Sequence, residues 1–519
     1  MSKGVHVAHN KLEASPQDQR GQGGHGAIPL SAGMLLVTLG VVYGDIGTSP
    51  MYTMKSIVAN NGGIGTVSED MILGALSLVI WTMTLVTTVK YVVIAMKADN
   101  HNEGGIFALF SLVRKVAPWL ILPAMIGGAA LLADGILTPA VTVTTAIEGL
   151  RTIEWGHALL GDGQTNVIII TIIIICGLFA MQRAGTSSIG KLFGPLMTLW
   201  FLFLAGAGLF NMLGNLSILR ALNPIRGIMF LFSPINHSGI MVLVFVFLST
   251  TGAEALYSDM GHVGKANIYA SWPFVKAALI LNYLGQGAWL LANNSNPQML
   301  AMDIVNPFYM MLPEPLRPFA IVLSAVAAII ASQALITGSF SLVSEATRLN
   351  LMPHLRIHYP SDTKGQLYIP LVNNIMWVGC IFIVLLFQNS ERMESAYGLA
   401  ITVTMLMTTT LLTSYIAGIL KHKLGACIFA LLFGAIELCF FASCLTMFFD
   451  GGYVMIFLAA LLFGREVNGA KAWFEFGSFR VQPVEFAKIA TALALARVMS
   501  EYSFSINRAG DLFRVGMVI

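Results

Sequence analysis

The chain has 519 residues, of which 56% are hydrophobic and only 11% are charged, and its formal net charge at pH 7 is +3. Soluble domains carry about 25% charged residues, so this composition, with a mean hydropathy of +0.76, excludes an ordinary soluble protein. No basic patch with interleaved aromatic residues occurs, which argues against nucleic-acid binding. The five cysteines have no CxxC spacing and indicate neither a disulfide framework nor a zinc site. We therefore expect an integral membrane protein without a cofactor, surrounded by the lipid bilayer.

Apolar runs recur along most of the chain. Residues 1–30 are polar and glycine-rich and are expected to form a disordered cytoplasmic tail. A spanning helix needs about 20 apolar residues. Runs of that order lie at about 33–58, 71–96, 119–148, 166–182, 189–214, 238–258, 273–294, 317–342, 369–387, 395–420 and 424–449, and a shorter run follows at 451–464. The sequence thus predicts an all-α transmembrane domain over residues 31–463 with about 11–12 spans.

Lys and Arg in the loops predict the orientation, because cytoplasmic loops carry an excess of both. If the N-terminus is cytoplasmic, most of these residues fall on the inner side. The outer loops then hold only Arg151, Arg220, Arg226, Arg317 and Arg392. We therefore expect a multi-pass protein of the cytoplasmic (inner) membrane with its N-terminus inside the cell.

The first span contains GVVYGDIGTSPMY, residues 40–52, which is unusual for a membrane helix. Its glycines and Pro50 loosen the helical ladder, and a charge at Asp45 is costly in lipid. Broken backbone at membrane depth is tolerated only where it is buried in protein or lines a water-filled cavity. We expect a discontinuous span whose unwound stretch 43–48 offers carbonyl oxygens to a small cation.

The sixth span is interrupted in a similar way by STTGAEALYSDMGH, residues 249–262, which includes Thr251 and Glu254. Interruptions in spans one and six are typical of two five-helix inverted repeats around a central site. In the third span Asp134, Thr138 and Thr142 are four residues apart and share one helix face. Tyr397 in the tenth span adds another hydroxyl.

Ordinary structural roles compete with these interpretations. A carboxylate within a span can pair with a basic residue, and Lys90 and Lys276 lie within spans. Glu148 is close to a helix end and could face water. Thr side chains in membrane helices commonly bond the preceding turn or a neighbouring helix, and Tyr397 could belong to an aromatic belt.

At these residues the chain resembles the KUP/HAK/KT family of potassium uptake permeases. The resemblance covers about residues 30–449. It rests on GVVYGDIGTSPMY (40–52), NHNEGGIFAL (100–109), ADGILTPAVTV (133–143), TGAEALYSDMGH (251–262) and YGLAITVTM (397–405), in the order of that family. It implies a LeuT-like fold of the APC superfamily with a 5+5 inverted repeat, and potassium uptake coupled to protons. Met51 stands where the family usually has Leu.

The resemblance also implies site residues. The residues that would bind potassium are Asp45, Tyr52, Asp134, Thr138, Thr142, Thr251 and Tyr397. Oxygens of carbonyls, hydroxyls and carboxylates suit a desolvated potassium ion, and a proton carrier needs a desolvated carboxylate. Glu254 is the first candidate for the proton carrier, followed by Glu148, which matches a family carboxylate linked to transport, and by Asp45. The function expected is a potassium–proton symporter and not an enzyme.

Alternative functions stay open, namely an amino-acid or polyamine permease of the same fold, or a partner in cell-wall synthesis. The last rests on residues 464–505, which resemble the early helices of the SEDS (RodA/FtsW-type) peptidoglycan polymerases through VNGAKAWFEFG and QPVEFAKIA. We expect residues 464–519 to be an unrelated, truncated fragment, with an amphipathic helix at 481–499. The permease family normally continues into a cytoplasmic domain, so whether the chain forms a homodimer stays open.

Overall fold

The computed structural model describes residues 28–448 apart from 162, 184–186, 301–304, 353 and 360–366, and beyond them residues 452, 465–467, 470–476 and 479–481. Residues 1–27 of the tail expected at 1–30, most of the short apolar run at 451–464 and residues 482–499 of the helix expected at 481–499 lie outside these residues. Within them, ten helices are long and apolar enough to cross a membrane, or eleven if one bent pair is a single span. The prediction of an all-helical, multi-pass membrane protein is therefore confirmed.

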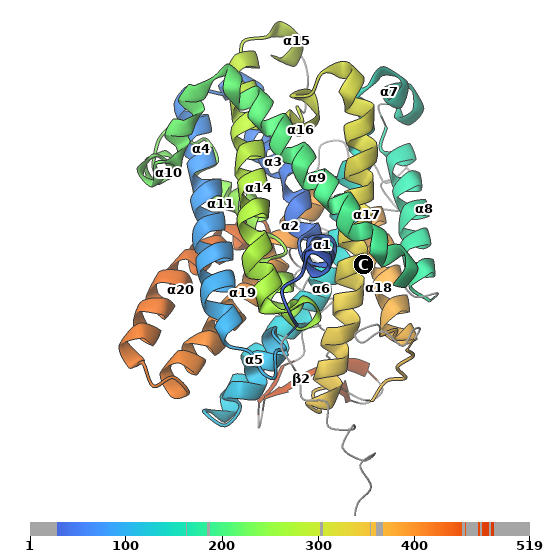
Figure 1. Ribbon diagram of the computed structural model, residues 1–519, viewed down its shortest axis with the longest axis vertical. Helices are drawn as coiled ribbons and strands as arrows, with labels where there is room; N and C mark the ends of the chain where they lie inside the picture. The colour runs from blue at the N-terminus through green and yellow to red at the C-terminus, as the bar shows by residue number, and fades with distance from the viewer. Residues whose placement is uncertain are drawn as a thin grey trace, which may run out of the picture.

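The long helices run roughly along the long axis of the molecule (Figure 1). They are α4 (Glu69–Thr82), α6 (Ile121–Glu148), α8 (Thr165–Gln182), α9 (Ser187–Gly214), α14 (Lys265–Asn293), α17 (Arg317–Arg348), α18 (Pro370–Phe387), α19 (Ser390–Gly418) and α20 (Lys423–Thr446). The span of α4 continues as a π-helix over Met83–Ile94. The span of α14 begins at Lys265, about two turns before the apolar run that predicted it, because polar residues of its first turns pack inside the protein.

Shorter helices connect the spans. They are α5 (Ile106–Val113), α7 (Glu154–Leu160), α10 (Pro224–Leu231), α13 (Met260–Val263), α15 (Pro297–Leu300) and α16 (Pro307–Met310). The 3₁₀ segments are Ser49–Met51, Ile64–Thr66, Ala95–Lys97, Pro118–Leu120, Gly149–Thr152, Leu216–Leu222, Gly239–Met241, Leu248–Thr250 and Glu314–Leu316. Helix α5 lies at one end of the molecule, and α15 and α16 lie at the other (Figure 1). We call these the α5 end and the α16 end.

Polar caps set several helix starts. Ser31 accepts a hydrogen bond from Met34 N at 3.2 Å and begins α1 (Ala32–Val41). Asn389 does the same for α19, accepting from Glu391 N at 2.9 Å. Such caps satisfy N–H groups that the helix leaves without partners. The cap at Asn389 fixes the start of α19, the helix that carries Tyr397.

The predicted first span forms two helical stretches that meet at a bend. Helix α1 ends at Val41, and the next helical stretch over Gly44–Asn60 is bent from it by 64°. That stretch comprises α2 (Gly44–Thr48), the 3₁₀ turn Ser49–Met51 with Pro50, and α3 (Thr53–Asn60). Residues 43–48 are not unwound as expected, because Gly47 N bonds Tyr43 O at 2.9 Å and closes a helical turn. The break is confined to Val42 and Tyr43.

The sixth span changes conformation at Thr251 and Gly252. Helix α11 (Val242–Phe247) and a 3₁₀ turn lead to Thr251, which is extended, and Gly252 has φ of +78°. Helix α12 (Ala253–Ser258) follows. A Cβ at Gly252 would lie 2.9 Å from Ile46 N and 3.1 Å from Asp45 Cβ. Glycine is needed here for both its φ and this close approach, and the approach places α12 directly against α2.

The described parts of residues 465–481 form strands and not helices. Strands β1 (Arg465–Val467), β2 (Ala470–Phe476) and β3 (Phe479–Val481) form an antiparallel sheet in that order. The backbone register aligns Glu466 with Lys471 and Glu475 with Arg480.

Candidate ion-binding site

Asp45 on α2 and Asp134 on α6 lie in one buried polar cluster together with Tyr397 of α19. The Tyr397 hydroxyl donates to the Asp45 carboxylate, with both carboxylate oxygens 3.0 Å away. The Thr138 hydroxyl lies 2.9 Å from Asp134 Oδ1 and 3.0 Å from the Tyr397 oxygen. Both carboxylates are 3% exposed. Three helices that are distant in the sequence thus bring two carboxylates and two hydroxyls together. We call these four residues the central cluster.

Tyr52 and Thr251 form a second contact between the broken spans. Their hydroxyl oxygens are 3.1 Å apart, and both side chains are completely buried. Tyr52 follows the 3₁₀ turn that contains Pro50, and Thr251 is the extended residue of the sixth span. Tyr52 lies between that 3₁₀ turn and α3, and Thr251 lies between a 3₁₀ turn and Gly252, so both hydroxyls are next to short helical segments.

Thr142 is one helical turn beyond Thr138, but its hydroxyl bonds the Thr138 carbonyl at 2.8 Å. This is the ordinary role of Thr in a membrane helix. Several carbonyls of residues 43–48 are also engaged. The acceptors are Tyr43 O, Asp45 O, Ile46 O and Gly47 O, which take bonds from Gly47 N, the Thr48 hydroxyl, the Ser49 hydroxyl and Trp200 Nε1. The side-chain oxygens of the central cluster are therefore the more accessible ligands.

The central cluster contains negative charge without a basic partner. Among the described residues, the ion pairs of buried carboxylates involve Glu148 and Glu437, and neither Asp45 nor Asp134 takes part in one. An isolated buried charge is very costly, so such groups bind a proton or a cation. The arrangement is suited to a small cation that supplies the missing positive charge.

Glu254 faces a different set of side chains. Its carboxylate accepts a bond from Tyr91 and another from Thr408 at 2.7 Å. The Tyr91 hydroxyl in turn lies 3.2 Å from Lys90 Nζ. Glu254 therefore does not join the hydrogen bonds of the central cluster, although Gly252, two residues earlier, touches α2.

Lys90 does not pair with any carboxylate that the sequence singled out. Its ammonium bonds Glu437 of α20 at 2.5 Å and Met405 O at 3.0 Å, and both charged side chains have no exposed surface. Thr409 donates to the same carboxylate at 2.7 Å. Glu437 is not among the residues predicted from the sequence, although a single acid in the apolar run of residues 424–449 is a usable signal.

Glu148 does not simply face water. It pairs with Lys55 of α3 at 3.2 Å, and Ser390 donates to it from the hydroxyl at 2.6 Å and from the backbone at 3.3 Å. Glu394 lies near this pair and accepts a bond from Ser56, while its Oε1 has no hydrogen-bond partner among the residues that the structure describes. This polar group ties α3, α6 and α19 together toward the α16 end. Lys55 and Glu394 were also missed, because their partners are distant in the sequence.

Among the described residues, ten long apolar helices surround a buried polar cluster, and together they define a multi-pass membrane protein. Residues 32–465 match the family model described as "K+ potassium transporter integral membrane domain", and the chain belongs to this family.

Similar curated proteins carry names that fit this family. The chain is 59% identical over 428 residues to "Probable potassium transport system protein Kup 1" of Lactococcus lactis subsp. lactis, and the match covers 82% of the chain and 63% of the relative. It is 54% identical over 430 residues to the "Probable potassium transport system protein Kup" of Clostridium perfringens, covering 83% and 65%. It is 56% identical over 446 residues to the protein of that name from Enterococcus faecalis, covering 84% and 67%. The chain thus spans less than two thirds of the first of these relatives.

Two solved structures are similar at low identity. The structure described as MhsT in complex with L-phenylalanine has a TM-score of 0.44 at 13% identity, covering 82% of this chain and 99% of that one. A manganese transporter from Eremococcus coleocola has a TM-score of 0.45 at 11% identity, covering 95% and 96%.

Proposed function

We propose that the chain imports potassium across the cytoplasmic membrane together with protons. The observation that carries this proposal is the central cluster, in which Asp45 and Asp134 lie without a basic partner among the described residues. A monovalent cation both compensates the charge and accepts oxygen ligands. The family and the printed names of the relatives support potassium as that cation.

In this proposal six residues surround the ion. Asp45 and Asp134 supply charge, and Tyr397 and Thr138 join them. Tyr52 and Thr251 supply hydroxyls from the two broken spans. The Thr142 hydroxyl bonds the backbone carbonyl of Thr138 and so helps to position Thr138, without contacting the ion itself.

We assign the proton to Glu254. It is 3% exposed, it is bonded to two hydroxyls, and Lys90 is already paired with Glu437. Protonation therefore removes its charge without breaking an ion pair. Glu148 and Asp45 are the next candidates, although Glu148 has Lys55 as a partner.

The breaks in the first and sixth spans support two five-helix inverted repeats that rock around the site. In the proposed orientation the N-terminus is cytoplasmic, so the α5 end faces the cytoplasm and the α16 end faces outward. Lys55 and Glu148 then hold the outer side closed. We further propose that residues 464–519 form a segment separate from the transporter, whose resemblance to the SEDS polymerases does not extend to activity. Whether the protein forms a homodimer does not alter these roles.

The test is uptake of radioactive rubidium by proteoliposomes that contain the full chain. An inward proton gradient should drive accumulation, and a protonophore should abolish it. Asp134→Asn should lose uptake, whereas Glu254→Gln should retain rubidium binding and lose the dependence on the proton gradient. The proposal is wrong if the wild-type chain accumulates no rubidium, or if an amino acid or polyamine and not rubidium stabilises it against heat.

A chain lacking residues 464–519 provides a separate comparison. Unchanged uptake is expected, because the central cluster and its supporting helices all precede this segment. A loss of uptake with intact folding would show that the segment contributes to transport.

A further inference from the structure

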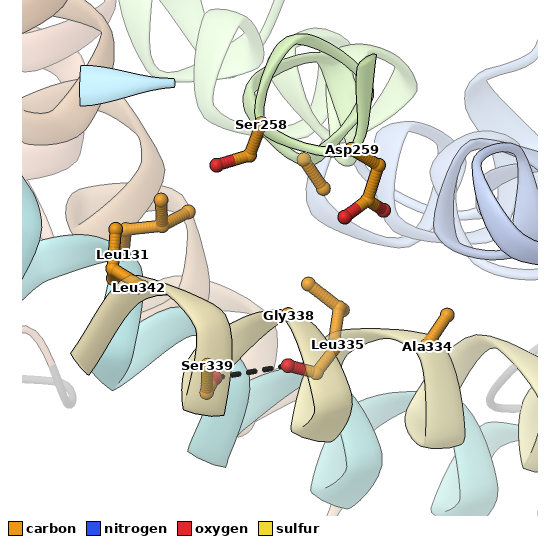
Figure 2. A pocket seen from close by; sticks show the side chains of 9 residues that line it. Leu131, Ser258, Asp259, Ala334, Leu335, Gly338, Ser339 and Leu342 are labelled. Atoms are coloured by element: carbon orange, nitrogen blue, oxygen red, sulfur yellow. Dashed lines mark hydrogen bonds between the residues drawn. The ribbon is translucent and has the colours of Figure 1, made fainter. Parts of the chain in front are cut away.

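Asp259 is another buried carboxylate, and it lies beside a cavity. It follows α12 directly and is 7% exposed. No hydrogen bond or ion pair joins its carboxylate to any of the described residues, which distinguishes it from Glu148, Glu254 and Glu437. Figure 2 shows the carboxylate pointing across the pocket toward α17. A charge in this position needs a partner, and the described residues do not supply one.

The pocket has room for such a partner. Its cavity volume is about 20 Å³, and a cavity of roughly 10–15 Å³ already holds one water molecule. Gly338 of α17 keeps it open, since a Cβ added there would meet only Asp259 Oδ1, at 3.8 Å. Ser258 and Ser339 also line the pocket, and Asp259 is the one titratable group in its lining. The Ser339 hydroxyl donates its proton to Leu335 O at 2.9 Å (Figure 2), so its oxygen offers a ligand only through the remaining lone pairs. Its chemistry is that of a monovalent cation site with oxygen ligands and a single negative charge.

The pocket lies next to the residues of the proposed site along three elements. On α6, Leu131 lines it and precedes Asp134 of the central cluster by three residues, which is about one helical turn of 5.4 Å. On α17, Leu335 lines it, four residues after Ala331, which contacts Gly44 of α2. On α12, Ala255 lines it and directly follows Glu254, which lies outside the central cluster. The displacements along α6 and α17 both point toward the α5 end, where α6 begins and α17 ends.

Further carboxylates continue in the same direction. Glu345 lies seven residues beyond Gly338 on α17, which is two turns along the same face. Glu103 is close enough to Glu345 for the two carboxylates to interact electrostatically. Carboxyl groups therefore continue from the central cluster past Asp259 to Glu345 and Glu103 toward the α5 end, where the positive charge of Arg348 also acts on Glu345.

We propose that the pocket beside Asp259 is a second binding site for the transported monovalent cation, on its way between the central cluster and the α5 end. This inference rests on the proposed function, because it takes the cation of the central cluster as its ligand. Asp259 and the hydroxyls of Ser258 and Ser339 bind the ion after it leaves Asp45 and Asp134. Gly338 provides the space.

The experiment is equilibrium binding of radioactive rubidium to the purified full chain in detergent. The wild-type chain is expected to bind one more rubidium ion than Asp259→Asn, in which an amide replaces the carboxylate. Gly338→Val fills the pocket and leaves the charge, and it should lose the same ion. Gly177→Val is the matched control, because a Cβ at Gly177 of α8 meets nothing within 4 Å. Gel filtration and thermal unfolding of each variant verify folding.

The outcomes separate the two proposals. If the wild-type chain binds rubidium, Asp134→Asn reduces that binding and Asp259→Asn leaves it unchanged, the second site is wrong and the central site stands. If Asp259→Asn changes only the number of protons taken up per rubidium ion, Asp259 carries a proton and the cation site is again wrong. If the wild-type chain neither binds nor accumulates rubidium, the proposed function fails and the second site fails with it.

Discussion

The phenolic oxygen of Tyr397 lies 3.0 Å from both carboxylate oxygens of Asp45, although the two residues are 352 positions apart in the sequence. Through Thr138 the same hydroxyl reaches Asp134. Tyr397 is therefore the bridge that holds the two carboxylates of the central cluster in one arrangement.

Tyr397→Phe removes this bridge and leaves the ring in place. A hydrogen bond to a charged group contributes about 1.5–3 kcal/mol, and about 1.4 kcal/mol corresponds to a tenfold change in affinity. We expect rubidium uptake at low rubidium concentration to fall by about tenfold or more. Tyr309→Phe is the control, since this buried tyrosine bonds Ser324 away from the central cluster. Equal losses in both variants would contradict a specific role for Tyr397.

Gly252→Ala should disturb the contact between the two broken spans. The new Cβ would lie 2.9 Å from Ile46 N, and the φ of +78° disfavours any residue with a side chain. A left-handed conformation costs roughly 1–2 kcal/mol in a residue other than glycine. We expect a lower midpoint of thermal unfolding and a loss of uptake. Gly206→Ala on α9, where the added Cβ meets nothing within 4 Å, should keep both near wild type.

The buried pair of Lys90 and Glu437 gives a prediction about stability. Removing one partner of a buried ion pair typically costs about 3–5 kcal/mol, whereas replacing both by neutral residues is often close to neutral. Lys90→Met and Glu437→Gln should each destabilise the protein strongly, and the double variant should recover most of the loss. Unfolding monitored by tryptophan fluorescence measures the three variants. If the two losses simply add in the double variant, the pair is not a coupled unit.

The buried carboxyl group of Asp259 should make the stability of the folded protein depend on pH. Burial raises the pKa of this carboxyl from 3.8 to about 7, so the folded protein binds more protons than the unfolded chain between these values. Stability from this group is therefore present at low pH and is lost as the pH rises through 7. Without rubidium, Asp259→Asn should unfold at a higher temperature than wild type at pH 8, with a smaller difference at pH 5.

Two controls accompany this measurement. Glu154→Gln on α7 replaces an exposed carboxylate and should leave the difference from wild type the same at both pH values. Saturating rubidium at pH 8 should stabilise the wild-type chain and narrow its difference from Asp259→Asn, because a bound cation compensates the charge. If Asp259→Asn is less stable than wild type at pH 8 without rubidium, the carboxylate of Asp259 does not carry an uncompensated charge in the folded protein.

Much of the site could be predicted from the sequence where a residue is unusual in its own context. Asp45 and Asp134 are carboxylates in apolar runs, and their cost in a membrane marks them before any partner is known. Glu254 stands out for the same reason. The number of spans followed from hydropathy, because the lipid requires about 20 apolar residues for each.

The sequence does not predict which of the buried charged residues pair with each other. Lys55 lies 93 residues from Glu148, and Lys90 lies 347 residues from Glu437, so no local pattern indicates which charges meet. Thr142 had the same spacing as Thr138 but bonds the backbone, since rotation about one side-chain bond decides between the two roles. The stretch 43–48 retained a helical turn because its carbonyls find local donors in spite of its glycines. These outcomes depend on packing, which is not encoded in residue spacing.

The separation of Asp45 and Tyr397 also has a consequence for how the protein is made. Chains are synthesised at about 5–20 residues per second, so the 352 residues between these two positions correspond to roughly 20–70 s of translation. During that time α2 has been synthesised but its partner hydroxyl has not. The nascent chain must keep the Asp45 carboxylate hydrated or protonated until α19 arrives. The central cluster is therefore completed late in biogenesis, and only when the helix that carries Tyr397 packs against the first span.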